Sequence, residues 1–132
     1  MKTISISQLN GKERILLIDD EEPVLDVIGQ ILSRFGYKVT PHNLSIEALK
    51  NFKASPYEFD LVITDKSMPE PSGETLVMEI KKVRPEIPVI LCTGSSEELF
   101  NGRGSAVNPD KILMKPAGKD ELLKSIRYLL DN

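Results

Sequence analysis

Charged and hydroxyl side chains follow four separate apolar runs in the sequence, each at the point where the run ends. Asp19 and Asp20 follow the first run, Asp65 and Thr93 follow two later runs, and Lys115 follows the last one. Short apolar runs that alternate with amphipathic stretches are typical of a parallel α/β sheet, in which ligands bind beyond the carboxyl ends of the strands. We therefore expect these side chains to meet at one edge of a sheet.

The chemistry expected of this edge is phosphoryl transfer. Three carboxylates in one place repel each other, so a cation is expected between them. Their hard oxygen ligands suit Mg²⁺, or the similar Mn²⁺, and Mg²⁺ keeps several waters when it binds a phosphate. With the ion in place, Asp65 can act as a nucleophile towards phosphorus. The Lys115 ammonium and the Thr93 hydroxyl can then bind the oxygens of the phosphoryl group.

The elements that position these residues alternate between strands and helices. Continuously apolar runs predict strands buried on both faces, and apolar residues at helical spacing predict amphipathic helices. Pro41 is predicted to end the second strand, Ser45 to cap the second helix, and glycines 102 and 104 to shorten the fourth helix. The predicted strands are residues 15–18, 37–40, 61–64, 89–92 and 111–114, and the predicted helices contain residues 23–35, 45–52, 76–83, 96–101 and 122–130.

Length and composition indicate one small, mildly acidic domain. The chain has 132 residues, and its 17 Lys and Arg against 20 Asp and Glu give a net charge of −3. This balance offers no basic surface for nucleic acid, and no apolar run approaches the roughly 20 residues of a membrane span. A single cysteine excludes an internal disulfide. We expect a cytoplasmic domain over residues 14–132, with a loose N-terminal arm or linker over residues 1–13 and no direct contact with nucleic acid or membrane.

Four motifs around the functional side chains carry a family resemblance. They are ILLIDDEE from residue 15, DLVITDKSMPEPSG from residue 60, VILCTG from residue 89 and LMKP from residue 113. In this order and spacing they resemble the receiver domain of two-component response regulators, over residues 14–130. The segments GKERILLIDDEE and IPVILCTGSSE are most similar to receivers attached to hybrid sensor histidine kinases.

The resemblance implies a fold and a set of roles. The fold is a flavodoxin-like five-stranded parallel sheet with strand order 2-1-3-4-5 and helices on both faces. Asp65 is the implied phosphoacceptor, and Thr93 and Lys115 contact the phosphoryl group. The implied ligands of the divalent ion are Asp19, Asp20, Asp65 and the backbone carbonyl of Ser67.

The same resemblance implies partners for the domain. The phosphoryl donor is a phosphohistidine on a histidine kinase or on a histidine phosphotransfer protein. The phosphorylated state then acts through an output domain or an effector protein. Such a domain is not an enzyme beyond its own Mg²⁺-dependent phosphorylation and dephosphorylation.

Two other functions remain as alternatives. Receivers usually carry an aromatic residue three positions before the lysine, where this sequence has Ile112, so a pseudo-receiver that only binds partners stays open. A haloacid-dehalogenase-like phosphatase also combines an aspartate nucleophile, a Thr or Ser, a Lys and acidic metal ligands. Its nucleophile comes first, within Asp-x-Asp, and its acidic pair comes last. Here the acidic pair comes first, and Asp65-Lys66-Ser67 lacks the second aspartate.

Overall fold

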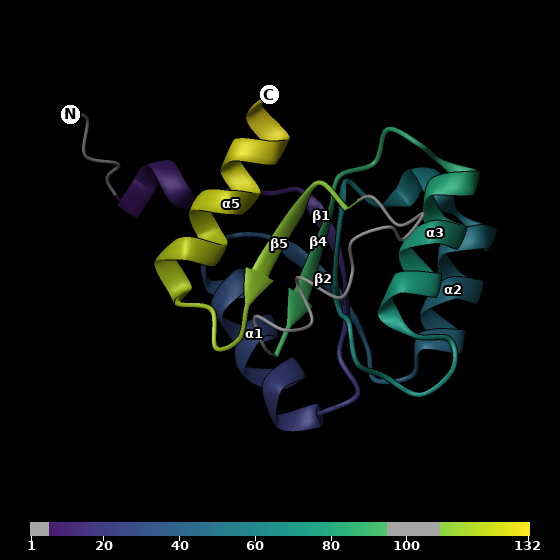
Figure 1. Cartoon of the computed structure of the whole chain (residues 1–132). Coiled ribbons are helices and arrows are strands. Elements are labelled where there is room, and N and C mark those ends of the chain that lie inside the picture. The colour runs from purple at the N-terminus through teal and green to yellow at the C-terminus, as the bar shows by residue number, and fades with distance from the viewer. Residues whose placement is uncertain (1–5, 95–108) are drawn as a thin grey trace.

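The computed structural model describes residues 6–94 and 109–132, which form a five-stranded sheet in the order β2-β1-β3-β4-β5 (Figure 1). All neighbouring strands pair in parallel, so the predicted strand order and direction are confirmed. Every residue of the two strands β3 and β4 is buried, as their apolar sequences predict. The strands are β1 (Arg14–Ile18), β2 (Lys38–His42), β3 (Leu61–Asp65), β4 (Val89–Thr93) and β5 (Lys111–Met114).

Helices cover both faces of the sheet. The helices α1 and α5 lie on one face, and α2 and α3 lie on the other (Figure 1). The predicted fourth helix, residues 96–101, lies outside the described residues. The helices are α1 (Glu22–Arg34), α2 (Ser45–Ala54), α3 (Gly73–Val83) and α5 (Lys119–Asp131), with short 3₁₀ turns η1 (Ile6–Leu9) and η2 (Pro56–Glu58).

Within residues 6–94 and 109–132, we find no helix with the length and apolar character needed to cross a membrane.

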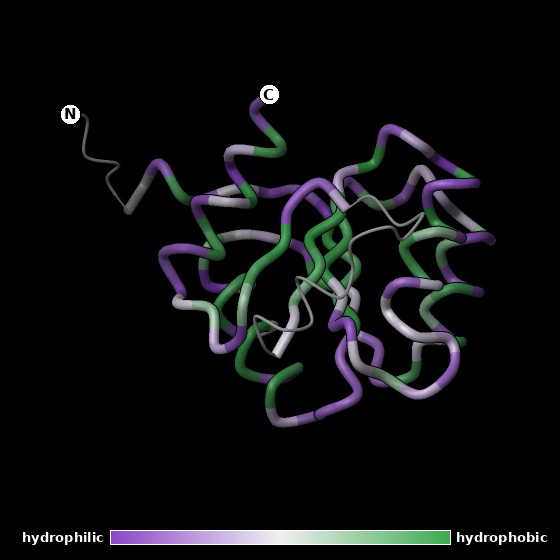
Figure 2. Tube along the Cα trace, in the orientation of Figure 1, coloured by the Kyte–Doolittle hydropathy of each residue, from purple (hydrophilic) through white to green (hydrophobic). Residues whose placement is uncertain are grey.

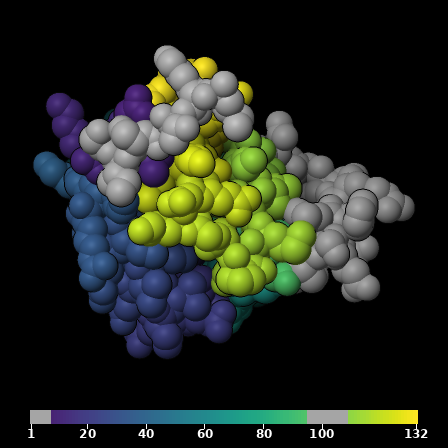
Figure 3. All heavy atoms as spheres, turned by 90° about the vertical axis from the view of Figure 1, so that its left-hand side faces the viewer, coloured from purple at the N-terminus to yellow at the C-terminus, as the bar shows by residue number. Residues whose placement is uncertain are grey.

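The sheet separates two apolar cores, because side chains alternate between the faces of a strand. Ile15 and Leu17 of β1 pack towards α1 and α5, whereas Leu16 and Ile18 pack towards α2 and α3. The central strands β1, β3 and β4 are mostly apolar, and polar residues recur along the helices (Figure 2). On the outer surface, α1 and α5 lie side by side and form one continuous face (Figure 3).

β2 runs past Pro41, which was predicted to end it. Pro41 pairs with Leu17 and His42 pairs with Ile18, so the strand continues to His42. β2 is an edge strand, and a proline is tolerated there because its missing N–H need not face another strand. The prediction treated Pro41 as a breaker, although the expected strand order 2-1-3-4-5 already places this strand at an edge.

Ser45 does not cap α2, contrary to the prediction. It is the first helical residue, and the N-cap position is Leu44, without a side-chain capping hydrogen bond. The Ser45 hydroxyl points instead to the loop after β3, which is treated below. Ile46 is 46% exposed although it is apolar. The buried face of α2 consists of Ser45, Ala48, Leu49 and Phe52.

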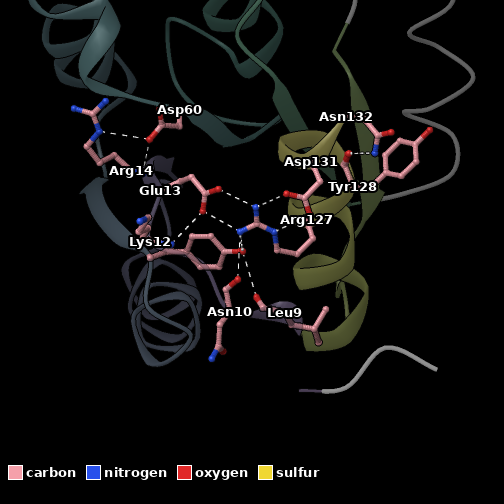
Figure 4. Close-up of polar contacts among 11 residues, drawn as sticks. Leu9, Asn10, Lys12, Glu13, Arg14, Asp60, Arg127, Tyr128, Asp131 and Asn132 are labelled. Atoms are coloured by element: carbon pink, nitrogen blue, oxygen red, sulfur yellow. Dashed lines mark hydrogen bonds and ion pairs between the residues drawn. The ribbon is translucent and has the colours of Figure 1, made fainter. Parts of the chain in front are cut away.

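Residues 9–13 of the expected N-terminal arm pack against the domain (Figure 4). Leu9 belongs to the core formed by α1 and α5, and Gly11 donates a backbone hydrogen bond of 2.9 Å to Phe35. The Arg127 guanidinium of α5 binds both carboxylate oxygens of Glu13, at 2.9 and 2.8 Å. A buried leucine, a backbone hydrogen bond and an ion pair therefore hold a segment that has no periodic pattern of its own.

Candidate functional site

A lysine lies between two buried carboxylates at the carboxyl edge of the sheet. Asp19 directly follows β1 and is 3% exposed, and Asp65 ends β3 and is 6% exposed. Lys115, directly after β5, donates to Asp19 Oδ2 at 3.1 Å and lies 3.3 Å from Asp65 Oδ1. Its Nζ is also 3.8 Å from Glu21 Oε1. The predicted meeting of Asp19, Asp65 and Lys115 is confirmed.

Backbone hydrogen bonds fix the strand ends that carry these side chains. The Asp19 N–H donates to the His42 carbonyl at 3.2 Å, and the Lys115 N–H donates to the Thr93 carbonyl at 2.7 Å. The Glu21 N–H donates to Asp19 Oδ1 at 2.9 Å, which turns the chain back over the aspartate. The backbones of Asp19, Glu21 and Lys115 are thus each attached to a neighbouring strand or turn.

The loop after β3 approaches the start of α3 closely. The Gly73 N–H donates to the Lys66 carbonyl at 3.0 Å. A Cβ added at Gly73 would overlap the Asp65 carbonyl oxygen and would lie 2.7 Å from the Lys66 Cα. Only glycine lacks a Cβ, so Gly73 allows α3 to begin against the backbone of Asp65.

Burial and charge shift the pKa values within the site. Burial raises the pKa of Asp65, and the charge of Asp19 adds to this rise, while the Lys115 ammonium opposes it. Burial lowers the pKa of Lys115, but its bonds to Asp19 and Asp65 outweigh burial, so its pKa is raised. Lys115 therefore stays charged at neutral pH, and the carboxylates outnumber it.

The carboxylates form a group suited to a divalent cation. One oxygen from each of Asp19, Glu21 and Asp65 lies within 4.8 Å of the others. An all-oxygen donor set fits a hard cation such as Mg²⁺ or Mn²⁺. Asp20 is exposed and lies outside this group, so its role as a ligand stays a prediction. Sequence reasoning missed Glu21, although it stands in the same acidic run.

The remaining predicted residues lie around this group. Thr93, at the end of β4, is fully buried. Ser67 is exposed in the loop after β3. Ile112 is 42% exposed on β5. Beside Thr93, a Cβ added at Gly94 would meet none of the described atoms within 4 Å.

A cavity of about 440 Å³ adjoins the site between α1 and the turn that follows β5. Asp19, Asp65 and Lys115 contribute to its lining, and the rest of the lining is mostly apolar. Val27 on α1 is 58% exposed although it is apolar. The carboxylate group is therefore flanked by an apolar surface that a partner can contact.

A sequence model of the response regulator receiver domain family matches residues 15–127. This match covers most of the chain, and the chain therefore belongs to the response regulator receiver domain family. Members of this family act as the receiver domains of two-component systems, as the resemblance implied. Membership also sets aside the phosphatase alternative.

Curated relatives include both a kinase and a regulator. The chain is 30% identical over 130 residues to the sensor kinase CckA of Brucella abortus, which covers 98% of the chain and 14% of the kinase. It is 30% identical over 117 residues to a CpxR homolog of Haemophilus influenzae, a transcriptional regulatory protein, covering 89% of the chain and 50% of that protein. The chain thus spans half or less of these relatives. The similarity to CckA agrees with the predicted likeness to receivers of sensor kinases.

Solved structures of receiver domains superpose over most of the chain. A receiver domain protein from Clostridium thermocellum has a TM-score of 0.83 and 32% identity, covering 90% of this chain and 94% of that one. The response regulator TrrA from Thermotoga maritima, solved in complex with Mg²⁺-BeF, has a TM-score of 0.78 and 32% identity, covering 89% and 99%. These likenesses agree with the strand order found here.

Proposed function

We propose that Asp65 accepts a phosphoryl group from a phosphohistidine of a histidine kinase or histidine phosphotransfer protein. The observation that carries this proposal is the buried Asp65 carboxylate, with Lys115 at 3.3 Å and the Asp19 and Glu21 oxygens within 4.8 Å. A carboxylate oxygen of Asp65 attacks phosphorus, the P–N bond to the imidazole breaks, and the imidazole nitrogen keeps the electron pair. The product is an acyl phosphate on Asp65.

The acidic group is proposed to hold Mg²⁺, or Mn²⁺ in its place. Asp19, Glu21 and Asp65 supply the carboxylates, and Asp20 and the Ser67 carbonyl are further candidate ligands. When bound, the ion neutralises charge on the carboxylates and on the incoming phosphoryl oxygens. This arrangement suits a site in which acidic groups otherwise outnumber the single lysine.

Lys115 and Thr93 are proposed to bind the phosphoryl oxygens. Lys115 is charged, and its Nζ already contacts the Asp65 carboxylate. The Thr93 hydroxyl lies at the neighbouring strand end and can donate a further hydrogen bond. Water later hydrolyses the acyl phosphate, so the domain dephosphorylates itself and turns over no other substrate.

The proposed partners act in the cytoplasm. The phosphodonor protein is proposed to lie over the cavity between α1 and the turn after β5, where apolar lining surrounds the acceptor carboxylate. The phosphorylated domain then changes its contact with an output domain or an effector protein. Nucleic acid and membrane are not proposed as direct partners.

Mass spectrometry of the intact protein tests the proposal. After incubation with Mg²⁺ and acetyl phosphate, the parent should gain one phosphoryl group, and Asp65→Asn should gain none. Asp26→Asn is the matched control, because Asp26 is exposed on α1, and it should match the parent. Absence of a mass gain in the parent would support the pseudo-receiver alternative instead.

A further inference from the structure

Ser45 is a buried hydroxyl whose hydrogen bonds leave its own helix. It is 5% exposed at the start of α2, where it caps nothing. Its Oγ lies 2.7 Å from the Pro71 carbonyl oxygen and 3.2 Å from that of Pro69, and it donates to this pair of acceptors. A buried hydroxyl that donates to the carbonyls of a neighbouring loop restrains that loop. If the loop moves away, these carbonyls lose their partner and must bind water instead.

The restrained loop, residues 66–72, joins the acceptor strand β3 to α3. At the start of the loop, the Lys66 N–H donates to the Cys92 carbonyl at 2.8 Å. At its end, the Gly73 N–H donates to the Lys66 carbonyl. In between, Pro69 and Pro71 have no N–H with which the loop could bond. Their carbonyls are the groups that Ser45 binds from α2.

We propose that Ser45 is a positioning residue for the divalent cation, acting through the backbone of residues 66–72. The Ser67 carbonyl, a candidate ligand under the proposed function on which this inference rests, lies in the same loop, two residues before the Pro69 carbonyl. The carboxylates are held by other elements: Asp19 follows β1 and its backbone bonds to β2, and Asp65 ends β3. Loss of the Ser45 hydroxyl therefore releases one backbone ligand and leaves the carboxylates in place.

The hydrogen bonds of Ser45 connect α2 to the loop of the candidate site. α2 packs on α3, and its own Ala48, Leu49 and Phe52 are buried in the core that the two helices share, so Ser45 is carried by a well-packed element. Residues that orient metal ligands from outside the ligand shell commonly change metal affinity without touching the ion. Ser45 fits this role because its partners are loop carbonyls and not the carboxylates.

Calorimetric titration of Mg²⁺ into Ser45→Ala and the parent tests the proposal. The variant should bind Mg²⁺ about threefold to tenfold more weakly, the range expected when one hydrogen bond no longer orders a ligand. Ser125→Ala is the matched control: its Oγ donates to the Glu121 carbonyl within α5 at 2.8 Å, away from the loop. The control should keep the parent affinity.

Amide exchange supplies a readout that does not depend on the ion. In metal-free Ser45→Ala, protection should fall at Lys66, Ser67 and Gly73, and it should stay unchanged along β1 and β5. If Ser45→Ala does not fold, Ser45→Cys takes its place, because it keeps the side-chain size and offers only a weak donor. The same loss of Mg²⁺ affinity is expected of it.

The outcomes separate this inference from the proposed function. Equal Mg²⁺ affinity in the parent and in the folded serine variant would overturn the role of Ser45, whatever its effect on stability. Failure of the parent itself to bind Mg²⁺ would overturn both the metal site and this inference. Weaker binding in the Ser45 variant alone, with Ser125→Ala unaffected, would support positioning through the loop.

Discussion

Replacing Glu13 by Gln should weaken the attachment of the N-terminal segment to α5. Arg127 donates two parallel hydrogen bonds, of 2.9 and 2.8 Å, to the Glu13 carboxylate (Figure 4). Arg127 also donates to the Asn10 carbonyl at 3.3 Å and to the Tyr37 hydroxyl at 3.1 Å. Glutamine keeps the size of the side chain but offers one acceptor oxygen and no charge. The fork geometry with Arg127 is therefore lost.

The magnitude follows from the pKa of Glu13. The hydrogen bond from Arg127 lowers this pKa from 4.5 to about 2. At about 1.36 kcal/mol per pKa unit, the charged Glu13 carboxylate can contribute at most roughly 3.4 kcal/mol to the free energy of unfolding. The Glu13 side chain is 27% exposed, and solvent screening reduces the contribution to about 1–2 kcal/mol. Glu13→Gln should lower the free energy of unfolding by that amount, about 1–2 kcal/mol, at pH 7.

The pH dependence gives a sharper test. Because folding lowers the pKa of Glu13, its stabilisation is complete above the unfolded value of 4.5 and is lost as the pH falls through about 2. Urea unfolding followed by circular dichroism at pH 7, 5 and 3 measures the difference between parent and variant. That difference should shrink to less than half by pH 3. An exposed control, Glu58→Gln, should show neither the loss at pH 7 nor the trend. A Glu13→Gln difference that is absent at pH 7, or constant with pH, would refute the reasoning.

Two further predictions concern the site and its surroundings. Gly73→Ala should lower the free energy of unfolding by about 1–3 kcal/mol, since the new methyl group overlaps the Asp65 carbonyl; urea unfolding measures this, and an unchanged midpoint would contradict the close approach. Burial raises the pKa of the Cys92 thiol to about 12, so iodoacetamide at pH 8 should label Cys92 only after unfolding. Rapid labelling of the folded protein, followed by mass spectrometry, would contradict this.

The centre of the sheet could be predicted from the sequence because β1, β3 and β4 are mostly apolar runs. β3 and β4 are buried on both faces, and apart from Thr64 their residues are apolar up to Asp65 and Thr93. In a parallel sheet all carboxyl ends lie at one edge, and the sequence order of the strand-end residues is then enough to bring Asp19, Asp65 and Lys115 together. Side-chain contacts across four strands thus followed from local patterns alone.

Contacts that depend on a distant partner could not be predicted in this way. Glu13 and Arg127 are 114 residues apart, and neither stands in a pattern that points to the other. Serine is a common N-cap residue, and Ser45 stands where a cap is expected. Its hydroxyl nevertheless donates to the carbonyls of a loop 24 to 26 residues later in the sequence. At Ser45, a tertiary hydrogen bond overrides the local preference for capping. For Glu13 and Arg127, the local sequence gives no signal of the contact.

Within the site, the sequence does not predict which of the acids after β1 joins the group of carboxylates. Asp19, Asp20 and Glu21 are consecutive acids beyond the end of β1, and composition makes each of them an equal candidate. Past the end of a strand the alternation of side chains no longer applies, so the turn decides which of them faces the sheet edge. Here the Glu21 N–H closes onto Asp19 Oδ1 at 2.9 Å, and the Glu21 oxygen comes within 3.8 Å of Lys115, whereas Asp20 is exposed. One hydrogen bond in a turn therefore selects which acid joins the group, and sequence patterning does not encode that choice.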